Sequence, residues 1–267
     1  MIEKLIINTK PTKGLSDLNH ISKILGTKKM INQELQHILD INPQATIATR
    51  GYYTNYPVKA YAIKNDCALI VGYTDQMWIH CVGQDKNDLG VLLNEYKGLS
   101  PYFYSVEEWM LPLILATGKE EWRMETMRYM LDPNVIVPEP MNEIVSLTPD
   151  HTSYVFEHTN YREYTDMDYI RDRLEQDISA AIMKDGKPVA WGFTHDDGAL
   201  GFLHVLSEYR RKGYARDIVL ARIAKKREFG LPVYCNIVPD NTPTIKLMES
   251  LGFKPDRKIF WLRLHEA

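Results

Sequence analysis

One short basic segment in the second half of the chain has the residue types that bind a phosphate group. It reads Arg210-Arg211-Lys212-Gly213-Tyr214-Ala215-Arg216, follows an apolar strand-like run and opens a helical pattern. The first amides of a helix have no partner within the helix, and the helix dipole makes that end positive. Small residues let a phosphate approach such a backbone closely. The segment therefore predicts an anion site, most naturally for a pyrophosphate, whereas the plainer interpretation is a solvated basic start of a helix.

The elements that would position this segment have the clearest patterns in the chain. Residues 178–184, 187–194 and 199–206 have strand patterns, and Asp185-Gly186 and Asp197-Gly198 between them are turn signals. Three strands joined by two tight turns predict an antiparallel meander. We expect a helix over about 214–229 and a strand over 231–238. Because a helix separates them, strands 199–206 and 231–238 can pair in parallel through a crossover. A short helix capped by Thr242 and a last strand over 258–264 should follow.

The first half of the chain has a less regular pattern. We expect helices over 32–41, 86–97 and 106–116, and strands over 45–49, 59–64, 68–73 and 77–82. Residues 122–131 fit a strand or a helix equally well. Half-buried strands explain the tyrosine-rich stretch 52–61 better than a base-stacking platform does. Proline-containing turns at 132–134 and 138–140 predict two domains, 1–138 and 139–267.

Composition excludes several classes of protein. Of the 267 residues, 45% are apolar and 25% are charged, which is typical of a folded globular chain. With 32 basic and 35 acidic residues, the formal charge of −3 argues against nucleic-acid binding through a whole-surface field. No apolar run is long enough for a signal peptide or a membrane span. The three scattered cysteines have no metal or disulfide spacing. We therefore expect a cytoplasmic protein with reduced, mostly buried thiols, no metal, no nucleic-acid partner and no membrane partner.

The order of these elements and three sequence motifs resemble the GNAT (Gcn5-related) N-acyltransferase superfamily over roughly residues 141–267. Residues 203–210 are similar to the family's strand before the loop, and Arg210-x-x-Gly213-x-Ala215 is similar to its acyl-CoA pyrophosphate loop. The last motif is similar to Asn241-x-x-Thr244-x-x-Leu247-Met248 followed by Leu251-Gly252-Phe253. Residues 187–191 and 229–234 further resemble the glycine N-acyltransferase branch. The resemblance implies a mixed α/β GNAT fold, with a degenerate GNAT-like N-terminal half in residues 1–138.

The resemblance also implies an enzyme that transfers an acyl group, by default from acetyl-CoA, to a small primary amine or amino acid in a ternary complex. Pantetheine would pair with residues 203–206, and the amide of Val205 or Leu206 would polarise the thioester carbonyl. The N-terminal half would shape acceptor specificity or form a homodimer. The implied cofactor-binding residues are Leu203, Val205, Leu206, Arg210, Arg211, Lys212, Gly213, Tyr214, Ala215, Arg216 and Asn241.

Two positions depart from the family pattern. The residue seven after Asn241, usually a tyrosine that protonates the leaving thiolate, is Met248, and the usual glutamate near the start of the strand before the loop is Ala199. A methionine cannot donate a proton and an alanine cannot accept one. These departures keep a second hypothesis open, in which the chain is a non-catalytic acyl-CoA-binding or sensing module.

Substitutes for the missing base lie nearby in the sequence. His204 has a suitable unperturbed pKa, but its position in the strand points it away from the side of Ala199 unless a bulge intervenes. Asp197 is the second candidate, although it is most simply a turn residue, and His195 and Asp196 flank it. A chain of water molecules is an equal alternative to any of these side chains.

Overall fold

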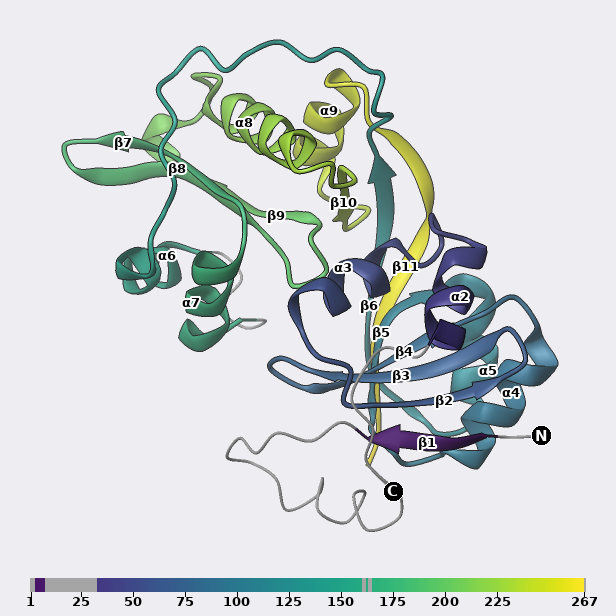
Figure 1. Ribbon diagram of the computed structural model, residues 1–267. Coiled ribbons are helices and arrows are strands. Elements are labelled where there is room, and N and C mark those ends of the chain that lie inside the picture. Colours follow the sequence, from purple (N-terminus) through teal and green to yellow (C-terminus); the bar gives the residue numbers. More distant parts are fainter. Residues whose placement is uncertain (1–2, 8–32, 160–161, 163–164, 267) are drawn as a thin grey trace. The chain divides into compact units, whose positions relative to one another are not determined.

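The computed structural model of the chain describes residues 3–7, 33–159, 162 and 165–266, and it separates into two compact units (Figure 1). Unit 1 is built from residues 1–125 and 258–267, and unit 2 from residues 126–257. The proline-containing segment 132–140, which suggested a boundary near residue 138, lies within unit 2, and the C-terminal residues return to unit 1.

The helices and strands occur twice in the same order: two helices, a three-stranded meander, then helix, strand, helix and strand. The first repeat, preceded by β1 (Glu3–Ile7), contains α2 (Gln33–Ile41), α3 (Ile47–Asn55), β2 (Ala60–Lys64), β3 (Cys67–Tyr73), β4 (Met77–Val82), α4 (Lys86–Glu95), β5 (Tyr102–Glu107), α5 (Leu111–Leu115) and β6 (Glu120–Met130). The second contains α6 (Thr152–His158), α7 (Met167–Gln176), β7 (Ser179–Lys184), β8 (Lys187–Thr194), β9 (Leu200–Val205), α8 (Tyr214–Glu228), β10 (Tyr234–Ile237), α9 (Thr242–Ser250) and β11 (Lys254–Leu264). Single 3₁₀ turns lie at Glu108–Met110, Pro149–His151 and Ser207–Tyr209.

The last strands of the two repeats are exchanged. Strand β6 ends the first repeat and pairs antiparallel with β10 of the second, whereas β11 ends the second repeat and pairs antiparallel with β5 of the first. Each unit therefore combines residues that are far apart in the sequence. This exchange explains why turn residues alone do not mark the division between the units.

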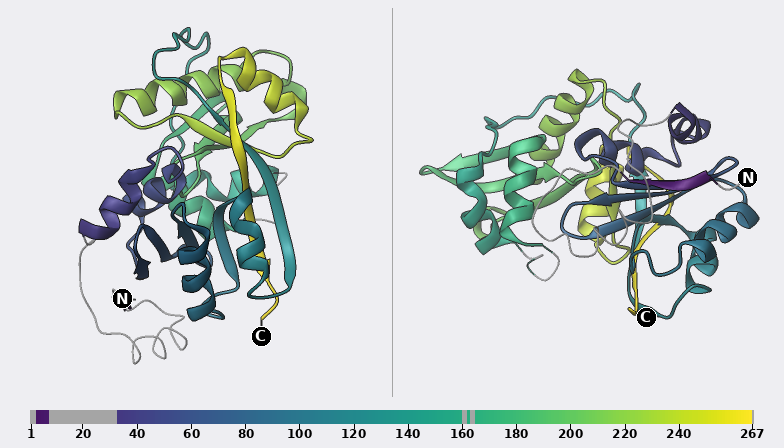
Figure 2. Two further views of the ribbon diagram at one scale, coloured as in Figure 1. Left: turned by 90° about the vertical axis from the view of Figure 1, so that its right-hand side faces the viewer. Right: turned by 60° about the horizontal axis from the view of Figure 1, so that its bottom comes forward.

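In unit 2, helices cover both faces of the meander β7-β8-β9 (Figures 1 and 2). On one face, Ile218 of α8 packs with Ala190 of β8, and other side chains of α8 and α9 pack against β10. On the other face, α6 and α7 pack against Trp191 and Phe193. Alternate residues of a strand point to opposite faces, so this pattern of apolar residues fixes the register of β8.

Most of the predicted elements of the second half are confirmed. The meander, the helix over 214–229 and the strand within 231–238 are present. The last strand is longer than expected and begins at Lys254. In the first half, strands 59–64, 68–73 and 77–82 and helices 32–41 and 86–97 are present, and the ambiguous residues 122–131 lie almost entirely in strand β6.

The strand predicted over 45–49 is wrong, because these residues lead into helix α3. The hydroxyl of Thr46 donates to the carbonyls of Leu39 and Asn42 and holds the turn that starts the helix. Buried residues then recur at helical spacing, with Ala48 four before Tyr52. Tyr52 and Tyr53 therefore pack on the sheet from a helix, not from half-buried strands. The helix predicted over 106–116 is shorter than expected because its first residues complete strand β5.

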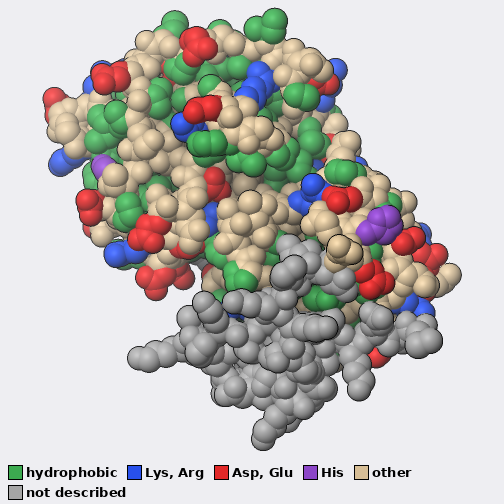
Figure 3. All heavy atoms as spheres, in the orientation of Figure 1, with side chains coloured by type: hydrophobic (Ala, Val, Ile, Leu, Met, Phe, Trp, Pro, Cys, Tyr) green, Lys and Arg blue, Asp and Glu red, His purple; other side chains and the backbone are tan. Residues whose placement is uncertain are grey.

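The cysteines and the surface charges lie as the composition predicted. All three cysteines are buried and free, as predicted. On the face drawn in Figure 3, acidic and basic side chains are interspersed. Among the described residues, every helix is too short or too polar to span a lipid bilayer.

We predict that Gly192→Ala destabilises the protein by about 2 kcal/mol. A Cβ at this position in β8 would lie 2.6 Å from Cζ of Arg222. That arginine is fully buried and donates to the carbonyls of Phe193 and Gly201, so it cannot move without losing these bonds. Denaturant unfolding measures the effect. The control is Gly90→Ala in α4, where the nearest atom, from Leu113, is at 3.9 Å. Equal stability of the two variants would refute this explanation of Gly192.

Candidate functional site

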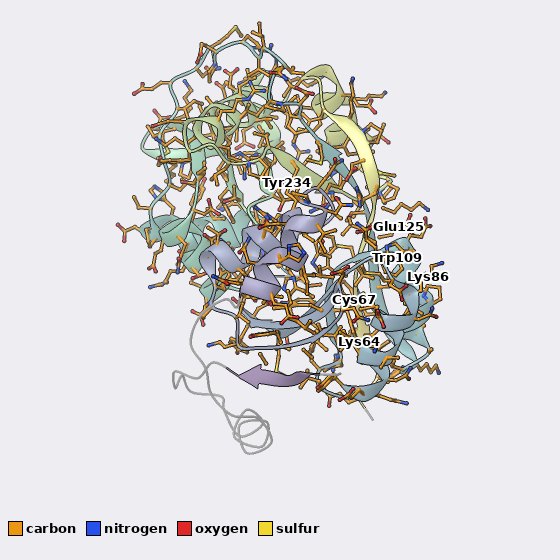
Figure 4. All side chains as sticks on the ribbon, turned by 45° about the vertical axis from the view of Figure 1, so that its right-hand side comes forward. Lys64, Cys67, Lys86, Trp109, Glu125 and Tyr234 are labelled. Carbon is orange, nitrogen blue, oxygen red and sulfur yellow. The ribbon has the colours of Figure 1, made fainter. Side chains whose placement is uncertain are left out.

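Strand β9 has an unpaired edge. Within the described residues it pairs only with β8, at the end of the sheet β7-β8-β9, while β10 pairs with β6. The parallel pairing that the sequence allowed between strands 199–206 and 231–238 is thus not formed. Near the start of β10, the hydroxyl of Tyr234, labelled in Figure 4, donates to the carbonyl of Asp197 at 2.6 Å. The backbone of β9 is left able to pair with an extended ligand.

The register of β9 decides which amide faces this edge. Val205 lies opposite Ala190, and the amide of Leu206 donates to the carbonyl of Val189 at 3.0 Å. Neighbouring residues of an antiparallel pair alternate between bonding the partner strand and facing away. The Val205 amide therefore faces the free edge, as its carbonyl does, which accepts from Nε of Arg210 at 3.1 Å. Of the two expected carbonyl-polarising donors, only Val205 is suitably oriented, and Leu206 is already bonded to β8.

A β-bulge changes the faces of the residues in β9. Phe193 lies opposite Gly201 and Trp191 lies opposite His204, so the two residues Phe202 and Leu203 oppose Gly192 alone. Phe202 has φ +46°, a left-handed conformation that is rare for a residue with a bulky side chain. The bulge that the sequence left open is present. It places His204 on the same face as Gly201, toward α6 and α7.

The basic loop after β9 leads directly into an uncapped helix. Arg211 at φ +61° and Gly213 at φ +80° turn the backbone, and α8 begins at Tyr214 with no side chain bonded to its first amides. These amides have no partner within the helix. Arg210 to Gly213 are exposed, and a Cβ at Gly213 would meet nothing within 4 Å. The loop thus presents unbonded amides and three exposed cationic side chains, which is the arrangement that binds phosphate groups.

Neighbouring side chains contact the loop but leave the first amides of α8 unbonded. The carboxylate of Asp217 in the first turn of α8 accepts from the amides of Met141 and Asn142 at 3.1 and 3.0 Å, so it does not cap the helix. Nζ of Lys212 lies 4.9 Å from the ring centre of Tyr209, and that ring stacks on Tyr214. Among the residues that the sequence predicted for this site, 210–216 are brought together at one end of β9.

His204 lies beside the expected reaction position. Its half-buried ring stacks on Trp191 with centroids 4.6 Å apart. Burial lowers the pKa of His204 below the usual range of an imidazole, and the positive charge of Arg210 lowers it further. The imidazole is therefore neutral at pH 7 and can accept a proton. Tyr154 and His158 of α6 stack on each other 4.1 Å apart next to the same tryptophan.

Asp197, the second candidate base, stabilises the turn between β8 and β9. Its Oδ1 accepts from the amide of Ala199 at 2.8 Å, and its carbonyl accepts from Tyr234. The side chain is fully buried on the turn between β8 and β9, where Nζ of Lys226 donates to the carbonyl of Gly198. Burial raises the pKa of Asp197 to about 7, and the charge of Asp196 adds to the rise. His195, beside it, is half-buried, and desolvation lowers its pKa to about 4.

Asn241 and Met248 lie on α9. The side-chain oxygen of Asn241 accepts from the amide of Thr244 at 3.3 Å, so Asn241 is the N-cap of this helix and the expected cap, Thr242, is its first residue. An Asn side chain explains the position without a ligand. Met248 is buried among apolar residues of α8, α9 and β10. A thioether has no proton to donate, so Met248 cannot act as a general acid.

The first repeat has a closed counterpart of this site. There β4 pairs in parallel with β5, Trp78 to His80 lying opposite Tyr102 to Tyr104. The helix that follows, α4, is capped by the carboxylate of Asp85, which accepts from the amides of Asn87 and Asp88 at 2.8 and 2.9 Å. A carboxylate on these amides repels a phosphate and takes its hydrogen bonds. Among the described residues, only the second repeat presents both an open strand edge and an open helix start.

The chain is similar to known proteins along most of its length. Residues 181–262 match a family model described as FR47-like protein. A Drosophila protein solved by X-ray crystallography is 16% identical with a TM-score of 0.73, over 90% of this chain and 98% of that one. An acetyltransferase of the GNAT family from Colwellia psychrerythraea is 14% identical with a TM-score of 0.55, over 98% and 100%. A tandem GNAT protein from the clavulanic acid biosynthesis pathway is 14% identical with a TM-score of 0.53, over 82% and 87%.

The chain thus has the mixed α/β GNAT fold that its sequence predicted. More particularly, residues 181–262, which include most of the meander, the basic loop and α8, are similar to the FR47-like family. Membership of the glycine N-acyltransferase branch stays a prediction.

We predict that Asp197→Asn changes how stability depends on pH. The folded carboxyl holds its proton up to about pH 7, whereas an unfolded aspartate loses it near 3.8. Stability from this group is therefore present below pH 3.8 and lost as the pH rises through 7. Relative to wild type, Asp197→Asn should gain about 2 kcal/mol between pH 5 and pH 8. Denaturant unfolding at both pH values measures this, and parallel curves for the two proteins would contradict it.

Proposed function

We propose that the protein is an acyl-CoA-dependent N-acyltransferase that uses a small primary amine as acceptor and acetyl-CoA as its default donor. One observation carries the proposal: the unpaired edge of β9 runs directly into the uncapped, basic start of α8. An extended chain that ends in a pyrophosphate complements these two features in that order. Pantetheine would pair with residues 203–205, and the pyrophosphate would lie on the amides of 213–216 among Arg210, Arg211, Lys212 and Arg216.

The chemistry needs three groups besides the donor. The amine nitrogen attacks the thioester carbon, and the negative charge that develops on its oxygen is stabilised by the Val205 amide. His204, neutral at pH 7, accepts the proton that the amine loses. The carbon–sulfur bond then breaks, and the thiolate takes a proton from water, because Met248 has none to give. Holding both substrates together supplies most of the rate increase in such a direct transfer.

A second function, a non-catalytic acyl-CoA-binding module, is favoured by Met248 and Ala199. The ring of His204 also packs on Trp191, as a structural histidine would. The two functions share CoA binding and differ in turnover. The test is to measure melting temperature with CoA and acyl-CoAs, and then to follow free thiol across a panel of amines. Thiol release supports the enzyme, a melting shift without thiol release supports the module, and no shift with any CoA species refutes both.

We predict that calorimetry finds one CoA site per chain. Reversing the charges of Arg211 and Lys212 to Glu should weaken CoA binding at least tenfold, because both side chains are exposed beside the open amides of α8. The matched control is Lys86→Glu at the first residue of α4, where Asp85 already caps the helix, and this variant should bind CoA as wild type does. Two sites per chain, or an equal loss in the control, would show that the loop is misassigned.

We predict that His204→Gln lowers kcat about 100-fold and leaves the Kd for CoA within twofold. The pKa of His204 is below that of a free imidazole, so the ring is protonated only in acid. Wild-type kcat/KM should therefore fall, through loss of the neutral His204 base, only below about pH 6.5. The variant should lack that acid limb. His158→Gln, which removes an imidazole from the same cluster, is the control and should keep kcat within a few fold. Wild-type turnover by His204→Gln would assign the base to water.

A further inference from the structure

A polar pair in unit 2 lies on β6 and β10, next to the proposed site. Arg128 and Asn236 are directly opposite each other in the antiparallel ladder. The adjacent pair, Tyr129 and Cys235, packs into the apolar core with α8 and α9. Because side chains alternate along a strand, Arg128 and Asn236 point to the opposite face. Opposed side chains on one face have Cβ atoms about 5 Å apart, so one small ligand can contact both.

Each member of the pair has a buried polar atom without a hydrogen-bond partner. These are Nη1 of Arg128 and Oδ1 of Asn236. The side chain of Arg128 is fully buried, and Nε donates to Asp256 at 2.8 Å while Nη2 lies 2.7 Å from the same carboxylate. Unsatisfied buried donors and acceptors are rare in proteins because each costs free energy. One donor and one acceptor left open side by side point to a ligand that has both groups.

The charges around the pair favour an anionic ligand group. Oδ2 of Asp256 is shared between Arg128 and Arg257, whose Nε lies 3.0 Å away, so these three residues carry two positive charges and one negative. A guanidinium has five N–H donors in a planar fork, which matches the geometry of a carboxylate. Nη1 of Arg128 is therefore suited to a carboxylate oxygen, and Oδ1 of Asn236 to an N–H donor.

The pair lies on the face on which His204 lies. Helix α8 packs against Leu203 and Val205 of β9 and against Cys235 of β10, so it covers one face of both strands. Asn236 and His204 have the opposite parity and lie on the face away from α8. Tyr234, two residues before Asn236 on the same face of β10, bonds to the turn that precedes β9.

We propose that Arg128 and Asn236 bind the acceptor, and that the acceptor is an amine that carries a carboxylate, such as an α-amino acid. Nη1 of Arg128 donates to the carboxylate, and Oδ1 of Asn236 accepts from the amine nitrogen and orients it. This inference rests on the proposed function, which it deepens by naming the acceptor class and the two residues that select it.

The test compares alanine with alaninamide as acceptors, using thiol release from acetyl-CoA. The two differ at the carboxylate, and the amide has the more easily deprotonated amine, so a preference for alanine reports recognition of the carboxylate. Wild type should prefer alanine at least tenfold in kcat/KM. Arg128→Gln should abolish this preference by raising the KM for alanine, with the KM for alaninamide and the Kd for CoA unchanged. Arg257→Gln removes the same charge from the same cluster but leaves Nη1 of Arg128 in place, so it should reduce the preference far less than Arg128→Gln does.

A second variant covers the case in which Arg128→Gln does not fold. Asn236→Asp has the same shape, and its carboxylate should repel that of alanine and raise its KM at least tenfold, with the value for alaninamide unaffected. Equal use of alanine and alaninamide by wild type, or an equal effect of Arg128→Gln and Arg257→Gln, overturns the proposal. Thiol release only with amines that lack a carboxylate also overturns it, while leaving the acyltransferase intact.

Absence of thiol release with every amine refutes the acyltransferase and not this pair. The melting temperature of the CoA-loaded protein then decides the question. A rise with alanine that is absent with alaninamide, and is lost in Arg128→Gln, supports the pair. No rise with either compound overturns it.

Discussion

Backbone amides at the edge of a strand need a partner, and along β9 the edge away from β8 has none in the described part of the chain. The natural partner, β10, pairs instead with β6, which is the exchanged last strand of the first repeat. The edge is therefore kept open by the way the chain is connected, and the binding of pantetheine proposed here depends on it. Every other feature of the site is placed with respect to this edge: Val205 faces it, the basic loop continues from it, and the bulge at Phe202 sets the face on which His204 lies.

The two repeats show how little separates an open site from a closed one. Both place a helix after the third strand of a meander, but α4 begins with the carboxylate of Asp85 on its amides and α8 begins with Gly213 and no cap. The same helix dipole thus attracts an acidic side chain in one repeat and is available to an external anion in the other. In the first repeat, β4 also pairs in parallel with β5, so the strand edge that is open in β9 is occupied there.

Local chemistry explains what the sequence predicted. Asp185-Gly186, with both residues at positive φ, and the alternating apolar residues of β8 define a hairpin within a few residues of each other. Helix α8 and its basic start were predicted from the sequence pattern in the same way. The exchange of β6 and β11 was not, because it joins residues more than a hundred positions apart and no local signal marks it. The bulge also lacks a signal, since Phe202 gives no hint of a left-handed backbone. Arg128 and Asn236 become a pair only through the register of two distant strands, and sequence reasoning therefore missed both.

The most direct test of the open edge is amide hydrogen exchange, resolved by residue, with and without acetyl-CoA. Binding of acetyl-CoA should slow exchange at Val205 and at residues 213–216. Leu206, whose amide is already bonded to Val189, should be slow in both states, and residues 85–88 of the first repeat should not change. Slowing at residues 85–88, or an unchanged Val205 amide in the CoA-bound protein, would contradict the account.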